Sequence, residues 1–187
     1  MRHILLPVCC RLRSACLVLC LASSLWSPSV GYVHAVSIEV WYSPVDEPLR
    51  RVAELYGRAK RYVFVAVYGL TSPLVVKPLV AAAKRGVDVR IITDRGRVDE
   101  AKQRAALSVL REAGIPIKVN RHDGLMHLKQ VAIDDEISTN GSMNHTTSGN
   151  RYNDERLDII RDHALTVQAR EKFLSMWKDD DRFEDWK

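Results

Sequence analysis

In the first half of the chain after residue 36, strand-like segments alternate with segments whose apolar residues have helical spacing. Residues 61–70, "RYVFVAVYGL", are rich in β-branched and aromatic side chains, which is typical of a buried strand. Residues 98–114, "VDEAKQRAALSVLREAG", carry apolar side chains at helical spacing and end in glycine, which predicts a helix. The elements expected in this half are strands at residues 37–42, 61–70, 87–93 and 115–119 and helices at residues 49–59, 72–86 and 98–114, the second helix with a kink at Pro78.

The second half has a different order, because short strand-like segments follow one another without a long helix between them. "HLKQVAID" and "EISTNGS" predict two strands, residues 127–134 and 136–142, joined near Asp134 and Asp135. The remaining expected elements are a strand at residues 155–161, an amphipathic helix at residues 164–177 and a solvated charged tail at residues 178–187. This order predicts an α/β fold with one mixed β-sheet sandwiched between helices.

The N-terminal residues are set apart by their composition. A basic start, an apolar run at residues 15–26 and small residues at 33–35 predict a secretory signal peptide over residues 1–35. The apolar run is shorter than the roughly 20 residues of a membrane-spanning helix, and an uncleaved anchor is the alternative. Cleavage would leave residues 36–187 as one domain, exported to the periplasm or secreted.

The expected mature domain differs from the whole chain in charge and in cysteine content. Loss of three arginines lowers the 28 basic residues to 25, against 23 acidic ones, so the formal charge falls from +5 to +2. All four cysteines lie within residues 1–35, which excludes cysteine catalysis and cysteine-ligated zinc from the mature domain. With so weak a net charge, binding of a polyanion would depend on a local basic patch.

The segment "LMHLKQVAID" (residues 125–134) places three chemically active side chains in an apolar run. Because residues two apart on a strand point to the same face, we expect His127 and Lys129 to project together. Asp134 ends the run, and "NGSMN" (residues 140–144) follows closely. An imidazole beside an ammonium group suits an anionic ligand.

These residue types fit phosphodiester chemistry. A neutral imidazole can attack phosphorus near neutral pH, so His127 is the candidate nucleophile, forming a phosphohistidine that water then hydrolyses. Charge on the non-bridging oxygens needs fixed donors, which Lys129 and Asn144 would supply while Ser142 adds a hydroxyl. These three are the candidate substrate-binding residues. None of the roles requires a metal, no further ligand cluster supports a metal site at "HDGLMH" (residues 122–127), and no cofactor is expected.

The ordered set H-x-K-x(4)-D-x(6)-G-S-x-N resembles the signature of the phospholipase D superfamily. Nearly all of residues 36–187 is similar to the small secreted bacterial endonucleases of this superfamily, which also includes the mitochondrial cardiolipin hydrolases. Further matching segments are "YSP" (42–44), "LVAAAKRGVDVRIITD" (79–94), "AGIPIKV" (113–119) and "NDERLDII" (153–160). The resemblance implies a phospholipase D-like fold with one motif per chain, and hydrolysis of phosphodiesters.

The resemblance also implies roles for residues whose chemistry alone leaves them open. Glu155 matches the glutamate that orients the nucleophilic imidazole in the family. Asp134 belongs to the signature and stays among the candidate catalytic residues, although its place seven residues beyond His127 fits a structural or interface role as well. Gly141 is expected where a side chain would block a tight turn or a close backbone approach.

The single copy of the motif has a consequence for assembly. In-line displacement needs a second group to protonate the leaving oxygen, and larger members of the superfamily carry two copies of the motif. None of the other histidines in this chain has a lysine two residues on. The economical solution is a two-fold homodimer in which both copies of His127 face one shared active site, with His122 and His145 as the first alternative proton donors.

The catalytic set does not distinguish nucleic acid from phospholipid, because both contain a phosphodiester. Arg95, Arg97, Arg121 and Arg151 could follow a polyanionic backbone, and no amphipathic membrane segment follows the signal. Together with the resemblance, this favours a metal-independent, sequence-tolerant endonuclease acting on DNA or RNA. A phospholipase D or cardiolipin hydrolase acting on membrane lipid is the alternative, followed by a non-catalytic nucleic-acid-binding module.

Overall fold

The computed structural model of the chain describes residues 35–187, so the predicted signal peptide lies outside the described residues except for its last position. The elements in chain order are β1 (Ser37–Ser43), α1 (Pro48–Arg58), β2 (Tyr62–Val67), α2 (Pro73–Lys84), β3 (Asp88–Thr93), the 3₁₀ helix η1 (Arg95–Arg97), α3 (Ala101–Glu112), β4 (Ile117–Asn120), β5 (Lys129–Ile133), β6 (Ile137–Gly141), α4 (Thr147–Arg151), β7 (Glu155–Arg161), α5 (His163–Trp177) and β8 (Phe183–Asp185).

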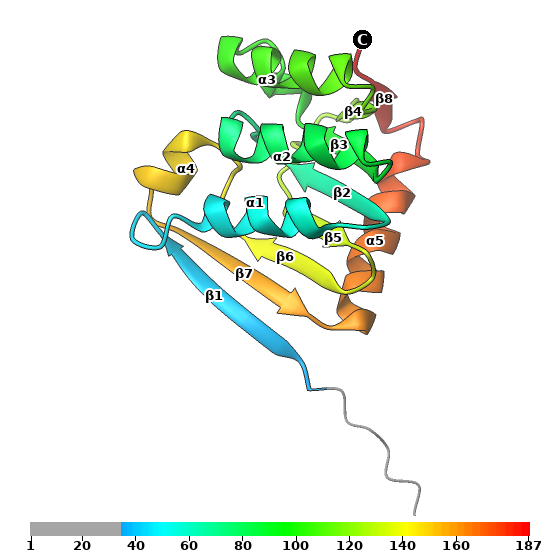
Figure 1. The fold of residues 1–187 in the computed structure, drawn as a ribbon. Helices are drawn as coiled ribbons and strands as arrows, with labels where there is room; N and C mark the ends of the chain where they lie inside the picture. Colours follow the sequence, from blue (N-terminus) through cyan, green and yellow to red (C-terminus); the bar gives the residue numbers. More distant parts are fainter. Residues whose placement is uncertain (1–34) are drawn as a thin grey trace, which may run out of the picture. The chain divides into compact units, whose positions relative to one another are not determined.

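Within residues 35–187, eight strands form one sheet in the order β1-β7-β6-β5-β2-β3-β4-β8. Strands β2, β3 and β4 run parallel, and every other neighbouring pair is antiparallel. Helices α1, α2 and α3 cover one face of this sheet, whereas α5 covers the other (Figure 1). The predicted architecture, a mixed sheet between helices, is therefore confirmed.

The two covered faces explain why the central strand is apolar throughout. Every residue of β2 is buried. On the face of α1, α2 and α3, the core includes Leu49 and Leu79, which are fully buried. On the other face, the ring of Phe64 stacks on that of Phe173, with ring centroids 4.9 Å apart. A strand buried on both faces has no solvated side, so residues 61–70 show a continuous apolar run instead of alternation.

The charged C-terminal segment is not a solvated tail, and that prediction was wrong. Residues Phe183–Asp185 form β8, which pairs with β4, and the Phe183 side chain is buried. A strand of three residues is too short for its period to be recognised, yet one buried aromatic side chain and a free strand edge suffice to hold it. The short helices η1 and α4 were likewise not predicted, and α2 continues without interruption through Pro78.

Candidate active site

The ends of four strands meet at one edge of the sheet and carry most of the candidate residues. Val67, at the end of β2, pairs with Lys129 at the start of β5. Gly141, at the end of β6, pairs with Leu157 in β7. Strand β7 begins two residues earlier, at Glu155. Residues that are distant in the sequence are therefore brought to the same edge by strand pairing alone.

The candidate nucleophile His127 lies at the end of the loop between β4 and β5 and is exposed. Its neighbour Met126 is buried, and the backbone N–H of Met126 donates to Oδ2 of Asp94 at 2.7 Å. The His127 ring lies against Tyr68, with ring centroids 4.9 Å apart and planes tilted by 59°. The loop is thus held in place through the buried Met126, whereas the imidazole of His127 stays accessible, as a nucleophile requires.

Lys129 is a buried cation, with only 6% of its surface exposed. Its Nζ donates to the backbone carbonyl of His127 at 2.8 Å and lies 5.4 Å from the ring centroid of Tyr68. Burial lowers the pKa of Lys129, and the negative charge of Glu155 opposes this effect. An ammonium group has three donors, so it can bind an anionic oxygen at this edge in addition to the carbonyl.

The amide of Asn144 is held by the loop that follows β2. The backbone N–H of Gly69 donates to Oδ1 of Asn144 at 3.1 Å. The next residue, His145, donates its N–H to the carbonyl of Gly69 and accepts from the N–H groups of Thr71 and Ser72. These bonds tie the loop after β6 to the loop after β2. Because Oδ1 is occupied, Nδ2 is the donor that Asn144 offers to a ligand.

Ser142 and Glu155 form a pair beside the strand ends. Oγ of Ser142 donates to Oε2 of Glu155 at 2.5 Å, and Nδ2 of Asn153 donates to Oε1 at 3.0 Å. Oγ of Ser142 also accepts the backbone N–H of Arg156 at 3.2 Å. No hydrogen bond joins Glu155 to the His127 ring within residues 35–187, so the orienting role of Glu155 stays a prediction. Ser142 holds this carboxylate in place.

Gly141 is needed for the close approach of β6 to β7. Its φ is 147°, a backbone conformation that residues with a side chain rarely adopt. A Cβ atom at this position would lie 2.1 Å from the carbonyl oxygen of Arg156. The expected close backbone approach is therefore confirmed.

The structure does not bring Asp134 together with the other candidates. It follows the far end of β5, on the order of 15 Å from Lys129 at the usual rise of a strand. Its carboxylate accepts three backbone N–H groups, those of Lys60 at 2.8 Å, Arg61 at 2.8 Å and Tyr62 at 2.9 Å. This geometry fits the structural alternative, in which Asp134 fastens the β5–β6 turn to the start of β2.

The two alternative proton donors differ in their surroundings. His145 is fully buried, its Nδ1 lies 3.4 Å from the Tyr56 hydroxyl, and burial lowers its pKa to about 4. It has no access to a substrate outside the core. His122 is half-buried, with its ring 5.7 Å from that of Phe183, and it lines a hollow of about 200 Å³ together with His127. Of the two, only His122 could reach a bound ligand.

Two further observations concern residues 35–187 alone. No three histidine, cysteine, aspartate or glutamate side chains in this part of the chain are grouped so that they could hold a metal ion. None of its helices is both long enough and apolar enough to cross a bilayer.

Sequence reasoning missed two residues that build the site. Tyr68 contacts both His127 and Lys129, and Asp94 fixes the loop before His127. Each follows directly after a buried parallel strand, β2 or β3. Polar residues just beyond the carboxyl ends of parallel strands gather at the edge where ligands bind, and that position was the available signal.

The family model and the relatives that match this chain agree with one another. The family described as "Cardiolipin synthase, PLD-like domain" matches residues 52–177. A phospholipase D of Rickettsia felis is 28% identical over 140 residues, which is 75% of this chain and 67% of that protein. A mitochondrial cardiolipin hydrolase of Xenopus tropicalis is 27% identical over 136 residues, which is 73% of this chain and 64% of that protein.

A solved structure shares the fold. Nuc from Salmonella typhimurium, a phospholipase D family member, superposes with a TM-score of 0.74 and 28% sequence identity. The superposition covers 82% of this chain and 99% of that one, so the two chains share nearly the whole fold.

Proposed function

We propose that this chain, which belongs to the phospholipase D superfamily of phosphodiester hydrolases, is a nuclease acting on DNA and RNA. The choice of nucleic acid as substrate is supported by the cationic groove described below. The phosphodiesterase chemistry is supported by His127, Lys129 and Asn144, which all lie beside the adjacent residues Tyr68 and Gly69. Tyr68 contacts the first two, and Gly69 binds the third. A nucleophile, a cation and an amide donor thereby face one site, which is the set that phosphoryl transfer needs.

In the proposed reaction a ring nitrogen of His127 attacks phosphorus. The new N–P bond forms as the bond from phosphorus to the leaving oxygen breaks, and an acid on the opposite side protonates that oxygen. Lys129 and Nδ2 of Asn144 stabilise the charge on the non-bridging oxygens. Water then attacks phosphorus, gives a proton to the conjugate base of the acid and releases the free imidazole.

The acid that protonates the leaving oxygen in this scheme is His127 of a partner copy in a two-fold homodimer. Exposed apolar side chains around the catalytic edge support this assembly. They are Tyr42 (52% exposed), Val45 (87%) and Leu125 (60%). Tyr42 and Val45 line a hollow with Ser142 and Glu155, and Leu125 lines one with His127. An exposed apolar patch typically marks an interaction surface, and a second copy placed here would bring two sites together.

A phospholipid substrate is the second candidate, and the relatives named phospholipase D and mitochondrial cardiolipin hydrolase favour it. The resemblance to the small secreted bacterial endonucleases of the superfamily favours nucleic acid, as does a cationic groove described below. The two are separated by incubating the purified full chain with plasmid DNA, with RNA and with cardiolipin-containing vesicles, each with and without EDTA.

We expect cleavage of both nucleic acids in EDTA, because His127 supplies the nucleophile and Lys129 with Asn144 supplies the charge stabilisation that other nucleases take from a metal. Turnover of vesicles without turnover of nucleic acid would support the lipid candidate. Activity that disappears in EDTA and returns with one divalent cation would contradict the mechanism.

Export of the protein is a separate proposal. Residues 1–35 act as a signal peptide, and the mature protein in the periplasm or medium begins at Val36. N-terminal sequencing of the exported protein tests this. A retained N-terminal segment would favour the anchor and strengthen the lipid candidate.

A further inference from the structure

A groove leads away from the candidate active site between α2, α3 and α4. It consists of two adjoining hollows of about 680 and 420 Å³, both lined by Pro73, Lys77 and Thr147. Arg97 lines the larger hollow, and its guanidinium carbon lies 5.2 Å from the ring centroid of Tyr68. Because Tyr68 is the ring that contacts the candidate nucleophile, the groove begins beside the reacting groups.

The larger hollow combines an apolar floor with a rim that holds two lysines and the ion pair of Arg97 with Glu100, whose nitrogen and oxygen lie 2.9 Å apart. Val76, Ala106 and Val109 contribute the floor, and Val109 is 48% exposed. Lys77 and Lys102 stand at the rim, are exposed and form no ion pair with a carboxylate within residues 35–187. An apolar surface bordered by free ammonium groups suits a nucleotide, whose base and sugar are partly apolar and whose phosphate is anionic.

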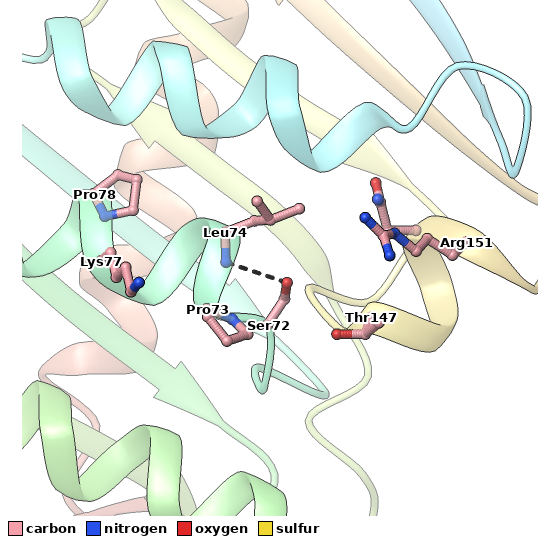
Figure 2. A pocket seen from close by; sticks show the side chains of 8 residues that line it. Ser72, Pro73, Leu74, Lys77, Pro78, Thr147 and Arg151 are labelled. Atoms are coloured by element: carbon pink, nitrogen blue, oxygen red, sulfur yellow. Dashed lines mark hydrogen bonds between the residues drawn. The ribbon is translucent and has the colours of Figure 1, made fainter.

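The smaller hollow has cations on two sides. Figure 2 shows Lys77 on α2 and Arg151 on α4 on either side of it, with the hydroxyls of Ser72 and Thr147 between them. Arg151 is partly neutralised, because its Nε lies 3.4 Å from a carboxylate oxygen of Glu47. Of these two cations, Lys77 is therefore the one that pairs with no carboxylate within residues 35–187 and is available to an anionic ligand.

One buried donor in the smaller hollow also lacks a partner. Asn150 lines the hollow, and its Oδ1 accepts the backbone N–H of Leu49 at 2.8 Å. Its Nδ2 is buried and has no hydrogen-bond partner within residues 35–187. A buried amide nitrogen without an acceptor is unfavourable, so the wall of this hollow contains an unused hydrogen-bond donor.

We infer that this groove binds the nucleic-acid strand flanking the scissile phosphate, with a nucleotide in the larger hollow and the next phosphate in the smaller one. The inference rests on the proposed nuclease function and deepens it. The catalytic edge and the two hollows present positive charge at successive places along one path. A polynucleotide repeats its phosphates along such a path, whereas a phospholipid headgroup carries its phosphate at one place.

The test measures binding of a fluorescein-labelled 20-nucleotide single-stranded DNA to the full chain carrying His127→Asn, which prevents cleavage. Lys77→Glu and Lys102→Glu are introduced singly and together, and Lys84→Glu, an exposed lysine at the other end of α2, is the matched control. Each groove variant should raise Kd by about 3- to 10-fold and reduce the salt dependence, the slope of log Kd against log salt, by about 0.7. Lys84→Glu should change neither quantity.

A second measurement separates this inference from the function on which it rests. In the active chain, the ratio of kcat/KM for the oligonucleotide to kcat/KM for bis(p-nitrophenyl) phosphate should fall in both groove variants and stay unchanged in Lys84→Glu. If the double variant keeps the Kd, salt slope and ratio of the unmodified groove while DNA is still cleaved, the groove is not the binding site and the nuclease function stands. If the unmodified chain cleaves neither DNA nor RNA, the nuclease function itself fails.

Discussion

The two ends of β5 carry parts of one sequence signature but differ in how their polar groups are satisfied. At the first end, Lys129 is buried with one carbonyl as its hydrogen-bond partner among the described residues, and the His127 imidazole is open to solvent. At the other end, the Asp134 carboxylate accepts three backbone N–H groups. Spare hydrogen-bonding capacity is expected where a ligand binds, whereas a carboxylate held by three backbone N–H groups supports the fold.

The largest expected effect is at the open end. His127→Asn removes the nucleophile and, in a shared site, also the acid supplied to the partner, so kcat/KM should fall at least about 10³-fold. The thermal midpoint should not fall, because the side chain is exposed. Kinetics with a small diester substrate and thermal unfolding of the same sample measure both quantities.

Mixed dimers sharpen this result. Dimers made by co-expressing differently tagged unmodified and His127→Asn chains should be nearly inactive if two copies of His127 form one site. Half of the activity would show that each chain carries a complete site. In that case the second proton donor has to be sought within the chain, with His122 first because it shares a hollow with His127.

At the satisfied end the expected effect is on stability. Asp134→Ala leaves three backbone N–H groups without their acceptor and should lower the free energy of unfolding by about 3 kcal/mol. Activity per folded molecule should be kept. Urea unfolding measures the first and active-site-normalised kinetics the second, with the exposed Asp181→Ala as control. Lost activity at unchanged stability would place Asp134 in the reaction after all.

An effect of similar size, which appears only as the pH is lowered, is expected from the buried His145. Because the pKa of His145 is lowered to about 4 in the folded protein from 6.5, the unfolded chain binds more protons between these values. The free energy of unfolding should therefore fall as pH drops below 6.5, by up to about 3 kcal/mol at pH 4. Urea unfolding at both pH values measures this fall. It should be weaker in His145→Gln and unchanged in the exposed His163→Gln.

The smallest effect is expected at Ser142. Its hydroxyl holds Glu155, and a second donor, Asn153, remains on that carboxylate when the hydroxyl is removed. Ser142→Ala should therefore lower kcat/KM by no more than about 10-fold, since Asn153 still holds the carboxylate when the hydrogen bond from Ser142 is lost. Steady-state kinetics beside Ser175→Ala, an exposed serine on α5, measures the difference. A loss as large as that of His127→Asn would mean that Ser142 contacts the substrate directly.

The sequence predicts best where neighbouring residues determine the outcome. His127 and Lys129 are two residues apart, so their proximity follows from the local sequence, although β5 begins only at Lys129 and His127 lies in the loop before it. The apolar run of β2 and the glycine-terminated α3 are also local patterns, and both elements are present. The mixed sheet between helices follows from the order of such elements.

What could not be predicted depends on contacts between distant segments. Tyr68 and Asp94 are common residue types at strand ends, and their roles arise only when β2 and β3 are set beside the loop before β5. Asp134 is part of the motif, yet only the three N–H groups of another strand's start show how its carboxylate is used. Strand β8 depends on the edge of β4, which no property of its own three residues reveals.

That last strand has a practical consequence for recombinant work with this protein. Phe183 is buried, and the backbone N–H of Trp186 donates to the carbonyl of Ile117 in β4 at 2.9 Å. Deletion of the charged C-terminal residues 182–187 would expose the hydrogen-bonding edge of β4 and the apolar surface beneath Phe183. An uncovered edge of this kind recruits strands from other molecules, so such a truncation should precipitate on concentration, whereas an affinity tag added after a flexible spacer should be tolerated.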